Sequence, residues 1–345
     1  MKKVITLLLA VLMIFSLAAC KNNSNEPSTS GEAFYDMPDF SSPVTAAGDT
    51  AKFTLQEMLG WVNNTKNFSF DFATTLAKAE QTVYDNVEMK DGEVVKENVQ
   101  PLGLITYLFD NFDIAGLGDY DAADCEFYDS DKMVKVKEDK LPKTFMECVV
   151  TEVCFDLTDG SYIIRAAYVI DEENESSTYF LTSRLTYLGD NQYKLMLRGE
   201  DYGDSNGKEY VYITTETFSF RADDYKMVDG TYKCEQRTSL VYETTINVGN
   251  SDKTTTTLIQ RSEVITVDID VKYEDGVYTA NREMIMKQSD ESYDPDKATE
   301  IYRVTQKIEQ KDGVYVLTER AKGVDNNGDP VDSTQYVTFT QKTEA

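Results

Sequence analysis

The fold of this chain is decided by residues 265–273, ITVDIDVKY, in which apolar and polar residues alternate without a break. The odd-numbered positions are apolar or aromatic, and the even-numbered positions are threonine, aspartate or lysine. Because successive side chains of a β-strand point to opposite faces, this pattern predicts a strand with one buried and one solvated face. Residues 231–248 alternate in the same way, which is typical of antiparallel sheets with one wet face.

Turn signals divide the second half of the chain at regular points. Five acidic two-residue corners each have a tyrosine two places on, and longer polar loops lie between them. Asp-Gly suits such corners because both positions tolerate positive φ. This alternation predicts an up-and-down meander of eleven strands after Phe145, with every tight corner at one rim. The five corners are Asp159-Gly160, Asp190-Asn191, Asp229-Gly230, Asp275-Gly276 and Asp312-Gly313.

Two amphipathic helices are predicted before the meander. Thr54 and Glu57 fit a capping box, so we expect a helix from Leu55 to Asn64. A second apolar stripe begins at Pro101 and predicts a helix to about Asp113. A twisted sheet of this size must curl or close. The predicted fold is therefore mainly β, a large antiparallel meander curled into a half-barrel or open barrel, with one or two helices covering its concave face.

Between these helices the period changes to two. Phe68, Phe70 and Phe72 alternate with smaller or polar residues, which predicts a long strand running toward Met89. An Asp-Gly turn follows at residues 91–92, and a return strand is expected over residues 94–99.

The first twenty residues have the pattern of a lipoprotein leader. Lys2 and Lys3 precede an apolar stretch that ends in Leu17-Ala18-Ala19-Cys20. The stretch is short for a hydrocarbon core that needs about 20 residues. It resembles the lipobox of bacterial lipoproteins, which implies cleavage before Cys20 and diacylglycerol on its sulfur. The alternatives are a plain secretory leader or an uncleaved anchor helix.

The domain organisation follows from these segments. Residues 1–19 are predicted to be the signal peptide, and residues 20–50 the lipidated cysteine with a flexible tether rich in Ser, Asn and Pro. Residues 51–345 are expected to form one β-rich domain, with a helix-containing part at 51–143 and the regular meander at 144–345. The predicted location is the cell envelope, on the extracytoplasmic face of a membrane.

Composition excludes several functions. The formal net charge is −27, spread along the chain, and loss of Lys2 and Lys3 would make it −29. Phosphate backbones would be repelled, so we expect no nucleic-acid partner. The chain has no histidine, which removes imidazole chemistry, and no nucleophile or cofactor motif stands in it. Asp325, Asn327 and Asp329 begin like a calcium loop, but the rest of that motif is missing. We predict no enzyme activity, no cofactor and no metal.

Four cysteines remain after Cys20. Cys148 and Cys154 fall in one predicted strand, too far apart to bridge each other. Cys125 and Cys234 could each pair with either of them in this compartment, so buried free thiols and disulfides both stay open.

The candidate ligand contacts lie on the apolar face of the predicted sheet. Tyr232 and Tyr242 share the parity of its apolar residues, as do the polar Arg261 and Glu263. Tyrosines also fill cores, and the polar pair could mark a β-bulge or a rim. The alternative is a concave, partly wet face that holds a ligand.

The order of tether, capped helix, aromatic strand and meander resembles the lipoprotein-carrier half-barrel family. That family includes the periplasmic carrier of outer-membrane lipoproteins and mycobacterial lipid-binding lipoproteins. The resemblance implies a concave face that accepts acyl chains. We therefore predict a binding lipoprotein for a lipid or amphipathic envelope component. The alternative is a surface lipoprotein with a packed core that acts through its polar loops on protein or glycan partners.

Overall fold

The computed structural model describes residues 51–70, 80–85, 89–90, 93–94, 119–128, 132–172, 175–205, 207–247, 254–324 and 328–340. Over these residues the protein is mainly β, with one large sheet and a separate two-stranded hairpin. The leader and most of the predicted tether lie outside the described residues. Among the described residues, no helix has both the length and the apolar character needed to cross a membrane.

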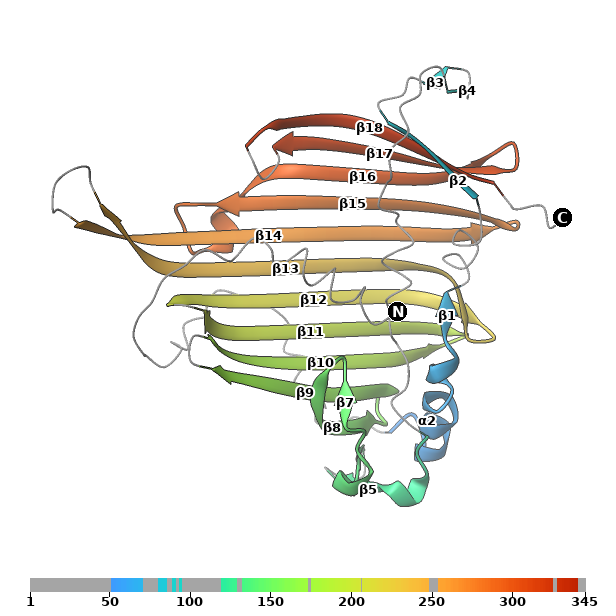
Figure 1. The fold of residues 1–345 in the computed structure, drawn as a ribbon. Coiled ribbons are helices and arrows are strands. Elements are labelled where there is room, and N and C mark those ends of the chain that lie inside the picture. Colours follow the sequence, from blue (N-terminus) through green and yellow to red (C-terminus); the bar gives the residue numbers. More distant parts are fainter. Residues whose placement is uncertain are drawn as a thin grey trace.

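The large sheet is built around the predicted meander of eleven strands, each antiparallel to the next (Figure 1). At one end β2 (Glu80–Asp85) extends it beyond β18, and at the other β6 (Met133–Val136) and β5 (Cys125–Tyr128) extend it beyond β8. These ends do not pair with each other, so the described sheet is open. The meander strands are β8 (Cys148–Asp156), β9 (Ser161–Glu172), β10 (Glu175–Gly189), β11 (Gln192–Ser205), β12 (Lys208–Asp223), β13 (Lys226–Asn247), β14 (Thr254–Glu274), β15 (Val277–Ser289), β16 (Thr299–Lys311), β17 (Val314–Val324) and β18 (Pro330–Thr340).

Three of the five predicted corners are confirmed as two-residue turns, the first lies within a four-residue turn at 157–160, and the third is wrong. The chain turns between β12 and β13 at Asp224 and Tyr225, whose φ values are 50° and 61°. Gly230 instead lies inside β13, directly opposite Phe220. A Cβ atom on Gly230 would stand 2.7 Å from the carbonyl oxygen of Ser219 and 2.9 Å from Cβ of Phe220. Glycine is therefore needed here for close strand packing rather than for a turn.

The first predicted helix is confirmed as α2 (Leu55–Val62), with the Thr54–Glu57 capping box at its start. Its apolar side packs at the rim of tight corners, where Figure 1 places it. The Trp61 ring centroid lies 6.0 Å from that of Tyr187 and 6.1 Å from that of Tyr193. This single helix covers only the corner end of the sheet face that it contacts. The predicted second helix, Pro101 to Asp113, lies outside the described residues.

The predicted long strand from Phe68 to Met89 is not one strand. β1 (Ser69–Phe70) pairs in parallel with β13, whereas β2 pairs with β18 at the far end of the sheet. Alternation of apolar and polar residues indicates that a segment is extended, but not which strand it pairs with. The prediction therefore treated β1 and β2 as one strand. A hairpin does follow, since β3 (Met89–Lys90) pairs with β4 (Glu93–Val94), whereas the predicted turn at 91–92 and the rest of the return strand, 95–99, lie outside the described residues.

The two faces of the sheet differ as the alternation predicted. The helix face, on which α2 packs, bears buried residues such as Leu195, Phe218 and Ile269. The charged face bears exposed residues such as Lys233 and Asp268. Short elements complete the described chain: β7 (Thr144–Phe145) and the 3-10 helices η2 (Thr65–Asn67), η3 (Ala122–Asp124), η4 (Glu138–Lys140) and η5 (Pro295–Lys297).

All four described cysteines are free thiols. Cys148 and Cys154 both lie in β8, as predicted. Burial raises the pKa of each of these two thiols to about 11, so little thiolate forms near neutral pH.

Candidate functional site

The strand register places all four predicted contact residues on the helix face, but not at one place. Tyr232 stands opposite Ile269, and Tyr242 stands opposite Ile259. The two tyrosines are about ten residues apart on β13, which corresponds to roughly 33 Å at the usual strand rise. Arg261 and Glu263 lie toward the same end of the sheet as Tyr242. The structure therefore separates Tyr232 from the other three.

A row of tyrosines crosses the helix face toward the rim of long loops. Tyr168 of β9 stands opposite Tyr179 of β10, and Tyr179 stands opposite Asp201 of β11. Asp201 in turn stands opposite Tyr212 of β12. Together with Tyr210, two places from Tyr212 on the same face, these residues form what we call the tyrosine band: Tyr168, Tyr179, Asp201, Tyr210 and Tyr212.

Two side chains of the tyrosine band, Tyr179 and Tyr210, lie against glycines. The Tyr168 and Tyr179 rings are stacked, with centroids 5.1 Å apart and planes 25° apart. A Cβ atom on Gly203 would stand 2.5 Å from the hydroxyl oxygen of Tyr210, and Gly199 lies beneath Tyr179 in the same way. These two glycines leave room for rings that cover the strands instead of standing away from them. All five band residues are partly exposed, unlike the closed aromatic core beneath α2.

Asp201 is the charged centre of the tyrosine band. Its carboxylate accepts a hydrogen bond from the Ser177 hydroxyl. Among the described residues, no lysine or arginine forms an ion pair with it. Burial raises the pKa of Asp201, and the nearby Glu175 carboxylate raises it further. An ionised carboxylate here is thus held between aromatic rings without a cationic partner.

The helix face continues from the band to the other predicted residues. Tyr212 stands opposite Thr238, which stands opposite Glu263. Burial raises the pKa of Glu263, while the charge of Arg261 opposes that rise. Arg261 Nε also lies 2.8 Å from an oxygen of Asp290. Tyr242 is covered by a cation, since Lys208 Nζ lies 4.9 Å from its ring centroid.

Tyr232 belongs to a different, more buried polar group. Its hydroxyl donates to Glu216 at 2.9 Å, and burial raises the pKa of both side chains. On the strands beyond, Arg282 donates to Gln306 at 3.3 Å, and Gln306 donates to Glu319. The sequence pointed to Tyr232 alone among these residues, although the other members also share the parity of the apolar residues around them. That parity was the signal that could have found them.

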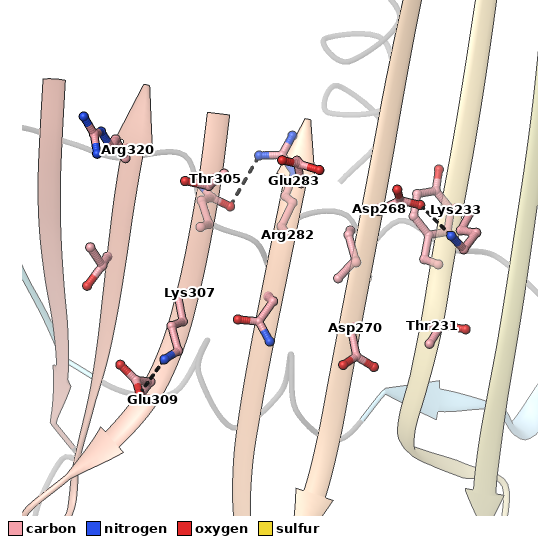
Figure 2. Close-up of a pocket in the computed structure, with 15 residues that line it drawn as sticks. Thr231, Lys233, Asp268, Asp270, Arg282, Glu283, Thr305, Lys307, Glu309 and Arg320 are labelled. Atoms are coloured by element: carbon pink, nitrogen blue, oxygen red, sulfur yellow. Dashed lines mark hydrogen bonds and ion pairs between the residues drawn. The ribbon is translucent and has the colours of Figure 1, made fainter. Parts of the chain in front are cut away.

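A hollow of about 720 Å³ lies on the opposite, charged face over β13–β17 (Figure 2). Its charges largely neutralise one another, since Lys233 pairs with Asp268 at 3.2 Å and Lys307 with Glu309 at 2.8 Å. Of the four predicted contacts, Tyr232 alone contributes to its lining. Besides Tyr232, its polar lining residues are Thr231, Lys233, Asp268, Asp270, Asn281, Arg282, Glu283, Thr305, Gln306, Lys307, Glu309, Thr318 and Arg320.

The chain matches no protein-family model, and neither a curated protein nor a solved structure matches it. Within the described ranges, no group of three or more His, Cys, Asp or Glu side chains is arranged to hold a metal ion.

Proposed function

We propose that this protein is a lipid-anchored extracytoplasmic binding lipoprotein, and that the helix face of its sheet holds an amphipathic envelope component. Cys20 would carry the anchor, and residues 21–50 would connect it to the β domain. The anchor would supply the membrane contact, because the formal charge of −27 opposes adsorption to anionic lipids. Since the chain has no histidine, the proposal involves no imidazole-dependent catalysis.

One observation carries the proposal: the helix face changes character from one group of strands to another. On β14–β16, two to four strands beyond the last strand of the tyrosine band, lies an apolar region in which Ile265 stands opposite Met286, and Met286 opposite Tyr302. Met286 and Tyr302 are only partly buried. Methionine side chains adapt to irregular apolar ligands, and each buried methylene contributes about 0.8 kcal/mol. An amphipathic molecule would place its chain here and its polar head at the tyrosine band.

The test is extraction of the protein purified from its own envelope. Organic solvent releases noncovalent ligands but not the acyl chains on Cys20, so the two can be distinguished by mass spectrometry. We expect an amphipathic compound at a fixed molar ratio, which falls in a Met286→Asp variant because a carboxylate in an apolar site is costly. Asp268→Asn, a change on the opposite, charged face, serves as the control. A folded protein that yields no such compound would contradict the proposal.

A packed interaction lipoprotein is the second candidate, and it too has a specific observation in its favour. Leu181, Leu197 and Val267 on the helix face are less than a tenth exposed. Such burial is expected of a closed core. The protein would then act through its loops, or through the charged hollow, on a protein or glycan. This candidate predicts no extracted ligand and capture of a partner that is lost when the hollow is altered by Asp268→Lys.

A further inference from the structure

We propose that the tyrosine band is a recognition site for an organic ammonium group, with Asp201 as its counter-ion. This inference rests on the proposed function and names the chemistry of the ligand's head. A quaternary or alkyl ammonium ion is attracted to the faces of aromatic rings and to a carboxylate, and sites that bind it combine the two. The band offers both groups on neighbouring strands.

The register sets the geometry of the site. Asp201 lies on β11 between Tyr179 on β10 and Tyr212 on β12, with Tyr168 stacked on the far side of Tyr179. Tyr210 lies two places along β12, over Gly203. Tyr179 and Tyr212 thus flank one carboxylate, with Tyr168 and Tyr210 nearby, on a sheet where backbone pairing rather than loops fixes their positions.

Asp201 has no cationic partner among the described residues, although burial raises its pKa. The groups that face it are the Ser177 hydroxyl, the Glu175 carboxylate and the surrounding tyrosines, and none of them is cationic. Three partly buried carboxylates on the charged face do have an arginine partner: Glu200 with Arg198, Asp229 with Arg221 and Glu283 with Arg303. A partly buried carboxylate without a partner is costly, and a ligand cation would remove that cost.

Other head groups fit less well. An anionic head would meet Asp201, Glu175 and the negative field of the whole chain. A neutral sugar could stack on the rings, but it would leave the carboxylate uncompensated. The site therefore selects a positive, weakly hydrated group over a negative or neutral one.

The experiment compares three ligands with the same tail: octyltrimethylammonium, octyl glucoside and octyl sulfate. Their binding to the full chain carrying Cys20→Ser is measured by calorimetry below the micellar range. We expect the trimethylammonium compound to bind at least about tenfold more tightly than the other two. Tetramethylammonium, which has no tail, shows whether a free organic cation suffices or a lipid head is required.

Matched variants distinguish binding of the ammonium group at the tyrosine band from its general attraction to an acidic protein. Asp201→Asn and Tyr212→Leu should each remove most of the preference for the ammonium head. Asp268→Asn, which removes the same charge from the opposite face, should leave it unchanged. Equal binding of all three heads, unaffected by Asp201→Asn, would overturn the inference and leave the proposed function standing. Tetramethylammonium binding as tight as that of the octyl compound would support the ammonium site and contradict the amphipathic ligand.

Discussion

Replacing Gly230 with alanine should destabilise the protein by about 1–3 kcal/mol, the usual cost of overpacking. The new Cβ would stand 2.7 Å from the Ser219 carbonyl oxygen, 2.9 Å from Cβ of Phe220 and 3.1 Å from Cε2 of Phe218. The first of these is a backbone atom, which cannot rotate away. The strands must therefore separate locally, or Phe218 and Phe220 must move within a closed aromatic core.

Gly60→Ala is the matched control. It adds the same Cβ atom, but it is expected to raise the free energy of unfolding rather than lower it. Gly60 lies within α2, and nothing stands within 4 Å of the position that its Cβ would occupy. Alanine should stabilise this helix by about 0.5–1 kcal/mol. Urea unfolding of both variants and the parent, followed by circular dichroism and fitted with a common slope, gives the two free-energy differences.

A third variant decides between a strand and a turn at this position. If Asp229-Gly230 formed the corner, Gly230 would have positive φ, and asparagine would be tolerated better than alanine. Inside β13, asparagine should be worse than alanine, because it is larger. A Gly230→Asn variant as stable as the parent would refute the register. The point bears on function, because the pairing of β12 with β13 fixes which face each residue occupies.

Three further predictions follow from named contacts. Thr54→Ala should lower the free energy of unfolding by about 1 kcal/mol through loss of the α2 cap, whereas Thr54→Ser should not; equal loss in both would contradict the capping account. Cys154 should react slowly with iodoacetamide at pH 8 in the native protein and rapidly after unfolding, because burial raises its pKa to about 11; a thiol that resists alkylation even after unfolding would indicate a disulfide. Burial raises the pKa of Asp201 in the folded protein above its value in the unfolded chain. In the ligand-free protein, ionised Asp201 therefore lowers the free energy of unfolding at pH values above the folded-state pKa. It has no such effect at pH values below the unfolded-state pKa, where the carboxyl group is protonated in both states. Asp201→Asn should therefore raise the free energy of unfolding at neutral pH relative to Asp268→Asn, and this gain should vanish in acid; a gain that persists in acid would exclude titration of Asp201 as its cause.

The meander could be predicted because its strands and most of its turns are marked by short stretches of sequence. Alternation defines each strand, and acidic two-residue corners define where most strands end. The third corner could not be predicted in this way, because Tyr225 has no turn signature of its own. Its ring lies 5.7 Å from that of Phe68, and its carbonyl oxygen accepts a hydrogen bond from the Ser69 backbone. A contact with a distant segment thus selects this corner over Asp229-Gly230.

The candidate site was only partly predictable for a related reason. Parity within β13 and β14 placed Tyr242, Arg261 and Glu263 on the correct face. Their neighbours Tyr179 and Asp201 lie on other strands, and only the register between strands shows that they share a row. Parity alone also grouped Tyr232 with residues roughly 20 to 33 Å away, because the distance between two residues of a sheet depends on strand pairing as well as on parity.

Ring-labelled tyrosine resonances test most directly whether the tyrosine band is the ligand site. The Cys20→Ser chain, with its tyrosines labelled in the ring and assigned by single Tyr→Phe changes, is titrated with octyltrimethylammonium. The resonances of Tyr168, Tyr179 and Tyr212 should shift with one common dissociation constant, while those of Tyr162 and Tyr193 at the corner end stay in place. Shifts confined to the corner end, or no saturable shift of the band resonances, would contradict a binding site at the tyrosine band.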